Sequence, residues 1–252
     1  MINLAGQSVL ISGSSRGIGK ATALRFAEAG ANVAITYERN AAAATEVIDA
    51  LSTLGVQSHS YQVRHDDEAG LASAIQDIVS RWGSLDMAVA NAGIWKEAAV
   101  DEMTVEAFRE TMEINMLFSF LIAKHAARQM KTQGHGSIVL VSSTAGQRGE
   151  AHHSHYAASK GAQISFAKSL ASELAPYGIR TNCVAPGWVA TDMTSQTLTN
   201  PEEAAKVLSS IPLGRVADPE EIANAILFIS SPLASFINGE VLNVNGGAVL
   251  IG

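Results

Sequence analysis

An α/β fold is the class that this sequence predicts: a single doubly wound domain with a parallel sheet of about seven strands and helices on both faces. Short runs rich in β-branched residues alternate with Ala-rich helical patterns along the whole chain, and this order implies parallel pairing through right-handed crossovers. The run "SIVLVSS" (137–143) is apolar without strict alternation, as expected of a strand that helices cover on both sides. No linker or fixed-period repeat divides residues 1–252, so one domain is expected.

Strands are expected where β-branched and apolar residues cluster. In chain order they are "SVLIS" (8–12), "NVAITY" (32–37), "SHSYQV" (58–63), "MAVA" (87–90), "SIVLVSS" (137–143), "IRTNCVA" (179–185) and "EVLNVN" (240–245). The helical patterns between them predict helices over 18–29, 41–54, 68–82, 103–131, 156–175, 201–209 and 219–230. The helix 103–131 contains the apolar run "INMLFSFLIAKHAARQM" and is expected to lie in the core.

The segment 188–215, "WVATDMTSQTLTNPEEAAKVLSSIPLGR", differs from its surroundings because it is polar and carries two prolines. It follows the expected strand 179–185, and open α/β sheets bind ligands beyond the carboxyl ends of their strands. We therefore expect this segment to form a lid over a ligand cleft. An ordinary surface excursion is the alternative.

Composition argues against several classes of function. The 252 residues suffice for a sizeable core, and 47% apolar with 16% charged residues is typical of a compact globular protein. A net charge of −7 without a Lys/Arg cluster argues against nucleic-acid binding. Lys124 and His125 interrupt the longest apolar run, so no membrane association is expected. No signal-peptide pattern opens the sequence, so a cytoplasmic location is expected, and Cys183 is expected to be a buried structural thiol.

A glycine-rich turn lies between the first expected strand and the first expected helix. In "ISGSSRGIGK", Gly13 permits a tight turn, Gly17 lets the backbone approach a phosphate, and Gly19 allows close packing of helix on strand. The free N–H groups at the start of the helix attract an anion. Glycine-rich turns also occur for steric reasons, and the spacing is GxxxGxG rather than GxGxxG. The position in the fold nevertheless favours a dinucleotide site.

The end of the second strand, "AITYERN", bears on which dinucleotide binds. A ribose 2′-hydroxyl requires an acidic acceptor there, whereas a 2′-phosphate requires arginine. Tyr37 occupies the usual acidic position, and Arg16 and Arg39 could both reach a phosphate. Glu38 could accept a hydrogen bond from a hydroxyl instead. NADP(H) is therefore favoured as the cofactor, and NAD(H) stays open.

The stretch "HYAASK" (155–160) places Tyr156 and Lys160 four positions apart in an expected helix, so the two side chains share one face. A free phenol titrates near pH 10, and a cation within about 4–6 Å lowers that pKa. A tyrosine beside a lysine can therefore act as a proton donor. The alternative is a half-buried tyrosine beside a lysine that extends into solvent.

A set of motifs in a fixed order makes the chain resemble the short-chain dehydrogenase/reductase family over nearly its whole length. They are "GSSRGIG" (13–19), "NAG" (91–93), Asn115 in "EINMLFSF", "SS" (142–143), "YAASK" (156–160), "APGWVATDM" (185–193) and "INGEVLNVNGG" (237–247). The resemblance implies a Rossmann domain and an NAD(P)-dependent oxidoreductase acting on CH–OH groups, usually as a homotetramer. Within the family, the chain looks most similar to the 3-oxoacyl-acyl-carrier-protein reductases.

By the same resemblance, four residues are catalytic. Ser143 would hydrogen-bond the substrate oxygen, Tyr156 would be the general acid/base, and Lys160 would hold the nicotinamide ribose and lower the pKa of the tyrosine. Asn115 would support a water that leads protons to the lysine. The residues expected to bind cofactor, from the glycine turn, the second strand and this resemblance, are Gly13, Ser15, Arg16, Gly17, Ile18, Gly19, Tyr37, Arg39, Asn91, Ala92, Gly93, Tyr156, Lys160, Pro186, Gly187, Val189 and Thr191.

The sequence defines the substrate pocket less well than the cofactor site. Trp95, His153 and Trp188 are expected to line it together with Ser143. The three histidines of "GEAHHSHY" are a pattern that can bind metal. Because the chemistry of the family needs no catalytic metal, substrate contacts or a solvated loop are expected instead.

The sequence argues against an acyl carrier protein as partner, although the resemblance suggests one. Gly134 and Tyr177 replace the basic residues that this subgroup presents near the ends of two helices, and a net charge of −7 disfavours an acidic partner. A small-molecule carbonyl or alcohol is the expected substrate. Reduction of a 3-oxoacyl thioester with an acyl carrier protein as partner stays open, as do two alternatives: a sugar or secondary-alcohol dehydrogenase that uses NAD, and a non-catalytic dinucleotide sensor.

Overall fold

Seven parallel strands in one sheet determine where every loop of the molecule lies. The structure is a computed structural model, and it describes residues 2–250. The strands are β1 (Ser8–Ile11), β2 (Asn32–Tyr37), β3 (Ser58–Gln62), β4 (Met87–Ala90), β5 (Gly136–Val141), β6 (Ile179–Pro186) and β7 (Val241–Val244). Their order is β3-β2-β1-β4-β5-β6-β7, and all neighbouring pairs are parallel. The order turns back between β1 and β4, which is where doubly wound sheets bind ligands.

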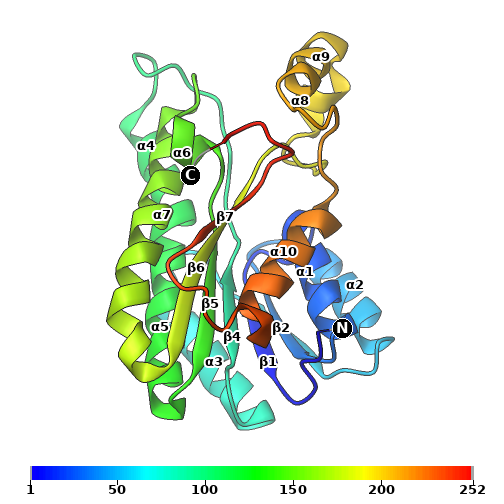
Figure 1. Ribbon diagram of the computed structural model, residues 1–252, viewed down its shortest axis with the longest axis vertical. Coiled ribbons are helices and arrows are strands. Elements are labelled where there is room, and N and C mark those ends of the chain that lie inside the picture. The colour runs from blue at the N-terminus through cyan, green and yellow to red at the C-terminus, as the bar shows by residue number, and fades with distance from the viewer. Residues whose placement is uncertain (1, 251–252) are drawn as a thin grey trace.

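Helices cover both faces of the sheet (Figure 1). On one face lie α1 (Gly17–Glu28), α2 (Ala41–Ser52) and α10 (Pro219–Ser230), and on the other lie α3 (Glu68–Trp82), α5 (Phe118–Gln133) and α7 (Ser154–Leu174). Each face has its own apolar cluster, with Phe26 and Ile226 in the first and Ile122 and Leu170 in the second. Burial is worth about 1.5–3 kcal/mol per large apolar side chain, so both clusters hold the strands in register. The predicted fold class is confirmed.

Shorter elements complete the chain. They are α4 (Val105–Met112), the π-helical turn η1 (Glu113–Leu117), α6 (Ala145–Arg148), α8 (Ser195–Thr199), α9 (Pro201–Ser209) and the 3₁₀ turns η2 (Ala175–Tyr177) and η3 (Pro232–Ala234). Within residues 2–250, no helix combines the length and the apolar character that crossing a bilayer requires.

The expected helix 103–131 is interrupted in the structure. α4 and α5 are joined through η1, where the helical run widens and carries Asn115. Such turns contain an extra residue and often mark functional sites. The apolar periodicity does not reveal the interruption, because a π-turn changes the hydrogen-bond spacing and leaves the run helical. Helices α6 and α8 have four and five residues, which is too short to show a period.

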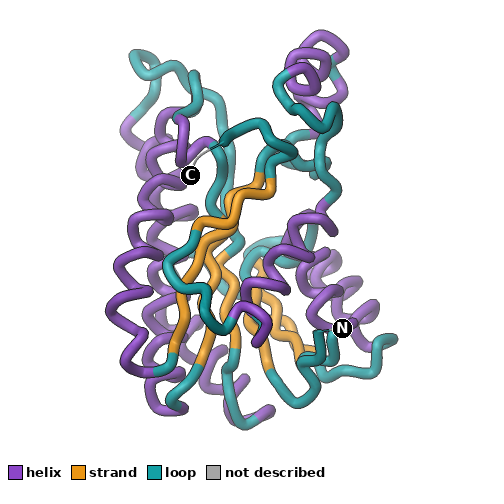
Figure 2. Tube along the Cα trace, in the orientation of Figure 1, coloured by secondary structure: helices purple, strands orange, loops and turns teal. Residues whose placement is uncertain are grey.

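β5 ends two residues before the expected end of its strand, so Ser143 lies in the loop that follows. The ladder continues briefly, because the Ser142 N–H donates to the Val184 carbonyl at 2.8 Å. In Figure 2 the loops that follow the strands gather at one end of the molecule. Ser143 therefore faces the same edge of the sheet as the other predicted site residues.

Segment 188–215 projects beyond this edge as α8 and α9, at the top right of Figure 1. Its base is closed: Val189 and Ala217 form an isolated parallel bridge, and the Ala190 N–H donates to the Ala217 carbonyl at 2.9 Å. The two ends of the segment are thus held together at its base, and the Leu213 N–H adds a hydrogen bond to the Gly246 carbonyl at 3.1 Å. The role of this segment as a lid stays a prediction.

Candidate active site

The glycine turn after β1 packs backbone against backbone. Gly13 and Gly17 have φ values of +65° and +54°, a region that side chains with a Cβ rarely adopt. A Cβ on Gly13 would come within 2.9 Å of the Ala92 Cα, and a Cβ on Gly19 would overlap the Gly13 carbonyl oxygen. Only glycine therefore lets this turn lie against the loop that follows β4.

Ser12 and Asn91 hold these two loops together. The buried Ser12 hydroxyl accepts hydrogen bonds from the N–H groups of Asn91 and Ala92, both at 3.0 Å. In return, the Asn91 amide donates to the Ser12 carbonyl at 2.9 Å and to the Gly13 carbonyl at 3.3 Å. Asn91 thus shapes the cofactor wall by fixing backbone.

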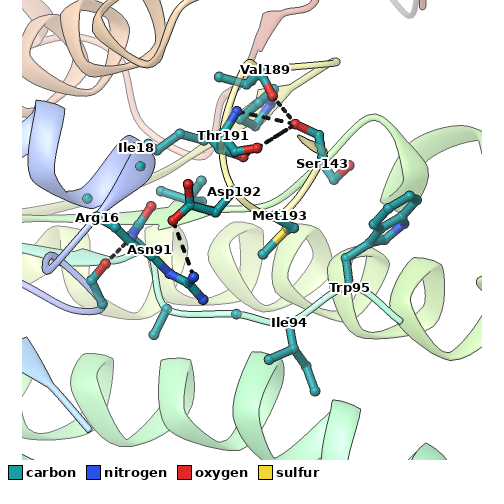
Figure 3. Close-up of a pocket in the computed structure, with 18 of the residues that line it drawn as sticks. Arg16, Ile18, Asn91, Ile94, Trp95, Ser143, Val189, Thr191, Asp192 and Met193 are labelled. Atoms are coloured by element: carbon teal, nitrogen blue, oxygen red, sulfur yellow. Dashed lines mark hydrogen bonds and ion pairs between the residues drawn. The ribbon is translucent and has the colours of Figure 1, made fainter. Parts of the chain in front are cut away.

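A cavity of about 680 Å³ runs from the glycine turn to Tyr156 and Lys160, within the range of small-molecule and cofactor sites. Every predicted site residue except Asn115 and His153 lines it. Figure 3 shows Arg16 and Trp95 at opposite sides of the view, with Met193 between them. Further residues on the wall are Glu38, Asn40, Ala43, Ile94, Lys96, Glu110, Ile114, Val141, Ser142, Thr144, Arg148, Glu150, Asp192, Met193 and Thr194.

The turn end of this cavity suits a phosphate. Residue Arg16 precedes α1 in an extended conformation, and its side chain makes no capping hydrogen bond. The first N–H groups of a helix lack partners within the helix, and its dipole is positive there. Gly17 brings bare backbone next to Thr191, whose methyl carbon would lie 3.4 Å from a Cβ at Gly17. The first N–H groups of α1, which no side chain of Gly17 covers, therefore suit the pyrophosphate of a dinucleotide.

Charged side chains surround the end of β2. Arg16 reaches Asp192 at 3.3 Å, and both side chains are exposed (Figure 3). Arg39 lies 3.5 Å from Glu38 and is also exposed. Glu38 in turn lies 3.3 Å from the His65 ring. The two predicted arginines are thus on the cavity wall, and Glu38 is shared between Arg39 and His65.

Lys160 is buried, with 4% of the residue exposed, and its ammonium donates to the Val141 carbonyl at 2.8 Å. The Ser142 hydroxyl donates to the Lys160 carbonyl at 2.7 Å, which adds a second link between β5 and α7. The ammonium lies 5.7 Å from the centre of the Tyr156 ring. A Cβ on Gly93 would lie 3.5 Å from this nitrogen, so the lysine adjoins the predicted cofactor wall.

The pKa values of this pair differ from the expectation. Burial raises the pKa of Tyr156 to about 12; hydrogen bonding with Ser143 opposes the rise and the charge of Glu150 adds to it. Burial lowers the pKa of Lys160 from 10.5 to about 8. The predicted lowering of the tyrosine pKa by Lys160 is not observed, because the ammonium is directed at a backbone carbonyl and burial dominates. At neutral pH Tyr156 is a neutral phenol, which is the form that donates a proton.

Asn115 is buried beside the cavity and clamps the loop after β4. Its side chain accepts from the Ile94 N–H at 2.8 Å, donates to the Ile94 carbonyl at 3.1 Å and donates to the Ser159 hydroxyl at 3.0 Å. Its own carbonyl accepts from Ser119 at 2.7 Å and from Gln163 at 2.9 Å. The observed role is structural, and the predicted water relay stays a prediction.

Two tryptophans line the substrate end of the cavity. The Trp95 and Trp188 rings meet edge to face, with centroids 5.8 Å apart at 85°. His153 is not on the wall, which corrects the prediction that it contacts substrate: it is buried against Trp95, with centroids 4.3 Å apart and ring planes 3° apart. Sequence spacing cannot distinguish a histidine that faces a pocket from one behind it. Sequence reasoning also missed Glu110 and Glu150, which lie on this wall without any motif to mark them.

Comparison with known proteins decides the family. Residues 13–249 match the family model described as "Enoyl-(Acyl carrier protein) reductase". Over 249 residues, 98% of each chain, the sequence is 39% identical to the 3-oxoacyl-[acyl-carrier-protein] reductase FabG of Aquifex aeolicus. The chain belongs to the short-chain dehydrogenase/reductase family. This membership confirms the predicted class, an NAD(P)-dependent oxidoreductase acting on CH–OH groups.

Two solved members of this family have nearly the same structure. One, from Agrobacterium tumefaciens and solved with bound NADP, aligns with a TM-score of 0.90 at 29% identity and covers 98% of both chains. The other is a 7α-hydroxysteroid dehydrogenase complexed with NADH and 7-oxo glycochenodeoxycholic acid. It aligns with a TM-score of 0.93 at 34% identity and covers 98% of this chain and 96% of its own.

Gly17→Ala should weaken NADPH binding by about tenfold or more, because the added Cβ stands where backbone must approach a phosphate. Gly55→Ala is the matched control, since its φ of +76° imposes similar strain and nothing lies within 4 Å of the added Cβ. Both variants should lose about 1–2 kcal/mol of stability. Fluorescence titration with NADPH, alongside thermal unfolding, checks this; equal affinities in the two variants would contradict it.

The stability of the protein should depend on Lys160 in a pH-dependent way. The unfolded chain keeps the lysine proton up to about pH 10.5, whereas the folded chain releases it near pH 8, so the free energy of unfolding rises with pH across that window. Between pH 7 and 10, the free energy of unfolding of the wild type should therefore rise by about 2 kcal/mol relative to that of Lys160→Met.

Urea unfolding at several pH values, without added cofactor, measures this difference. Lys168→Met, on an exposed position of the same helix α7, is the control for loss of a lysine. If the free energies of unfolding of wild type and Lys160→Met differ by the same amount at every pH from 7 to 10, the ammonium is not held in a desolvated site.

Proposed function

We propose that this protein uses NADP(H) to interconvert a small-molecule ketone and a secondary alcohol, with Tyr156 as general acid/base. One observation carries the proposal: Ser143, Tyr156 and Lys160 line the same cavity as the glycine turn. A proton donor, a hydroxyl that can orient a substrate oxygen and a phosphate-binding helix terminus thus face one space.

The residues divide the reaction between them. The glycine turn and Lys160 would hold the dinucleotide, whose nicotinamide would supply the hydride for the carbonyl carbon of the substrate. The Ser143 hydroxyl orients the substrate oxygen, and the Tyr156 phenol gives that oxygen its proton as the C–O double bond becomes single. Lys160, whose ammonium lies 5.7 Å from the centre of the Tyr156 ring, is proposed to hold the nicotinamide ribose rather than to set the tyrosine pKa. A phenol that holds its proton at neutral pH suits the direction of reduction.

Tyr156→Phe should lower turnover by about 10²–10⁴-fold, because it removes the proton donor while leaving the ring in place. The affinity for NADPH should stay within about threefold of the wild-type value, since the substitution leaves the other residues of the cofactor site unchanged. The control is Tyr177→Phe, at an exposed tyrosine away from the cavity. Undiminished turnover in Tyr156→Phe would sink this mechanism. Absence of turnover in the wild type, with NADPH still bound, would favour the alternative of a non-catalytic dinucleotide sensor.

NADP(H) is favoured over NAD(H) by the residues around the end of β2. Tyr37 stands where a carboxylate would otherwise accept from a ribose hydroxyl, and Arg16 and Arg39 are on the cavity wall. The neighbour from Agrobacterium tumefaciens was solved with NADP, whereas the 7α-hydroxysteroid dehydrogenase was solved with NADH. Glu38 is the residue that an NAD-dependent alternative would use.

Arg39→Ala should weaken NADPH binding by about tenfold, because one charge-assisted hydrogen bond to a 2′-phosphate is worth about 1.5–3 kcal/mol. NADH affinity should change little. Arg25→Ala, at an arginine paired with Glu28 and off the cavity wall, controls for loss of charge. Titration of each variant with both dinucleotides tests this; a parallel loss of NADPH and NADH affinity would count against a 2′-phosphate contact.

A small molecule is a better fit than a carrier protein, although the relative from Aquifex aeolicus is named for acyl-carrier-protein substrates. Gly134 ends α5, and the Lys131 ammonium lies 4.3 Å from the Tyr177 ring centre, so a nearby cation is held against an aromatic face. We keep 3-oxoacyl thioesters as a second substrate class.

Assembly as a homotetramer and a cytoplasmic location belong to the same proposal. Exposed apolar side chains on α4, η1 and α5 support assembly, namely Val105, Phe108, Leu117 and Phe120. Such a face commonly marks a contact between protein chains. Segment 188–215, which contributes Trp188, Thr191, Asp192 and Met193 to the cavity wall, is proposed to cover the substrate end.

A further inference from the structure

We infer that Trp95 and Trp188, held in place by His153, recognise ketones carried on a rigid apolar ring in preference to flexible linear 3-oxoacyl chains. The inference rests on the proposed function and names its substrate class. The two tryptophans, called the aromatic corner below, come from different loops, after β4 and after β6. They stand on the wall of the cavity that contains Ser143 and Tyr156.

His153 supports this corner from outside the cavity. Its ring lies parallel to the Trp95 indole, at a centroid distance of 4.3 Å, and only 8% of the residue is exposed. Its Nδ1 lies 3.1 Å from the Ala151 carbonyl; because a carbonyl can only accept, Nδ1 carries the proton. The histidine ring is thus fixed by a hydrogen bond on one edge and by the indole on one face.

A second link joins the same two loops. The Ala98 N–H donates to the His152 carbonyl at 2.7 Å, and His152 has a φ of +60°. Histidine is among the side chains that tolerate this region better than most. The loop with Trp95 is therefore attached at two points, His152 and His153, to the loop that leads into α7. His153 lies three residues before Tyr156. The distance between the aromatic corner and the proton donor is set by this attachment.

Two flat apolar rings at 85° favour a substrate that is itself rigid. A ring can contact one indole with its face and the other with its edge, and it loses no internal rotation on binding. A linear chain must freeze several rotatable bonds for the same contact, at a cost of about 0.5–1.5 kcal/mol for each immobilised flexible group. The Lys96–Glu110 ion pair, at 2.7 Å, lies on the same wall and offers polar partners beside the two indoles.

The test compares two ketones with NADPH and the full-length protein: the fused bicyclic ketone 2-decalone and the linear 3-oxoester ethyl acetoacetate. Wild type should show a kcat/KM at least about tenfold higher for 2-decalone, a difference of about 1.4 kcal/mol. In His153→Ala, the KM for 2-decalone should rise about tenfold while kcat changes less than about threefold. The constants for ethyl acetoacetate should change less than about threefold.

Two further variants separate positioning from general damage. His153→Phe keeps a flat ring behind Trp95 and should bring the KM for 2-decalone back to within about threefold of wild type. His152→Asn keeps a residue that tolerates positive φ at the exposed neighbouring position and should behave as wild type. Equal KM increases for both ketones in His153→Ala, or a wild-type preference for the linear ester, would overturn the inference.

A binding measurement makes the inference independent of turnover. In a Trp82→Phe background, Trp95 and Trp188 are the only tryptophans left, so 2-decalone should quench the remaining emission. Trp95→Ala in the same background should abolish that response. If wild type turns over neither ketone but the quench is present, the proposed function fails and the aromatic corner stands. If turnover is present and 2-decalone causes no quench, the aromatic corner is not the recognition site.

Discussion

The buried ammonium of Lys160 is the constraint around which the site is arranged. A charge taken out of water must find polar partners inside the protein, and this one finds the Val141 carbonyl at the last residue of β5. That contact, with the hydrogen bond from Ser142 to the Lys160 carbonyl, fixes the first turns of α7 relative to the sheet edge. Tyr156 lies one helical turn before the lysine, so its place follows from the same contact.

The loop that follows β4 holds the glycine turn in place relative to Lys160 and α7. Ser12 and Asn91 exchange hydrogen bonds between the loops after β1 and β4, and Asn115 clamps the continuation of the second loop at Ile94. Gly93, between them, lies against the Lys160 ammonium and the Asn115 side chain. The loops after β1 and β4 are therefore held by polar side chains that bond to neighbouring backbone. Such an arrangement keeps a binding site preformed.

Much of this could be predicted from the sequence, because parallel strands bring their carboxyl ends to one edge. Gly13, Ser143 and Tyr156 follow strands or begin a helix at that edge, so pattern and order alone place them together. The π-turn at Asn115 could not be predicted, since it leaves the apolar period unchanged. The orientation of His153 is also outside the reach of sequence, because loops have no period that assigns a face.

The direction in which the tyrosine pKa shifts could not be predicted for a similar reason. Spacing places Tyr156 and Lys160 on one helical face, but it does not say where a long flexible side chain points. The structure directs the ammonium at a strand carbonyl, and burial is the largest influence on the pKa of Tyr156. The Arg16–Asp192 pair shows the same limit: the sequence places the glycine turn and the segment after β6 at one site, but it does not predict that these two side chains pair.

The bridge between Val189 and Ala217 has a consequence for how such a protein can diversify. No residue between these two anchors belongs to a strand of the sheet, so a change in the length of α8 or α9 leaves the sheet register as it is. Closing a longer loop costs little, since the entropy of closure grows only slowly with length. A segment from another member could replace α8 and α9 between these anchors, which would exchange the molecules admitted while Thr191 and the rest of the cofactor wall stay as they are.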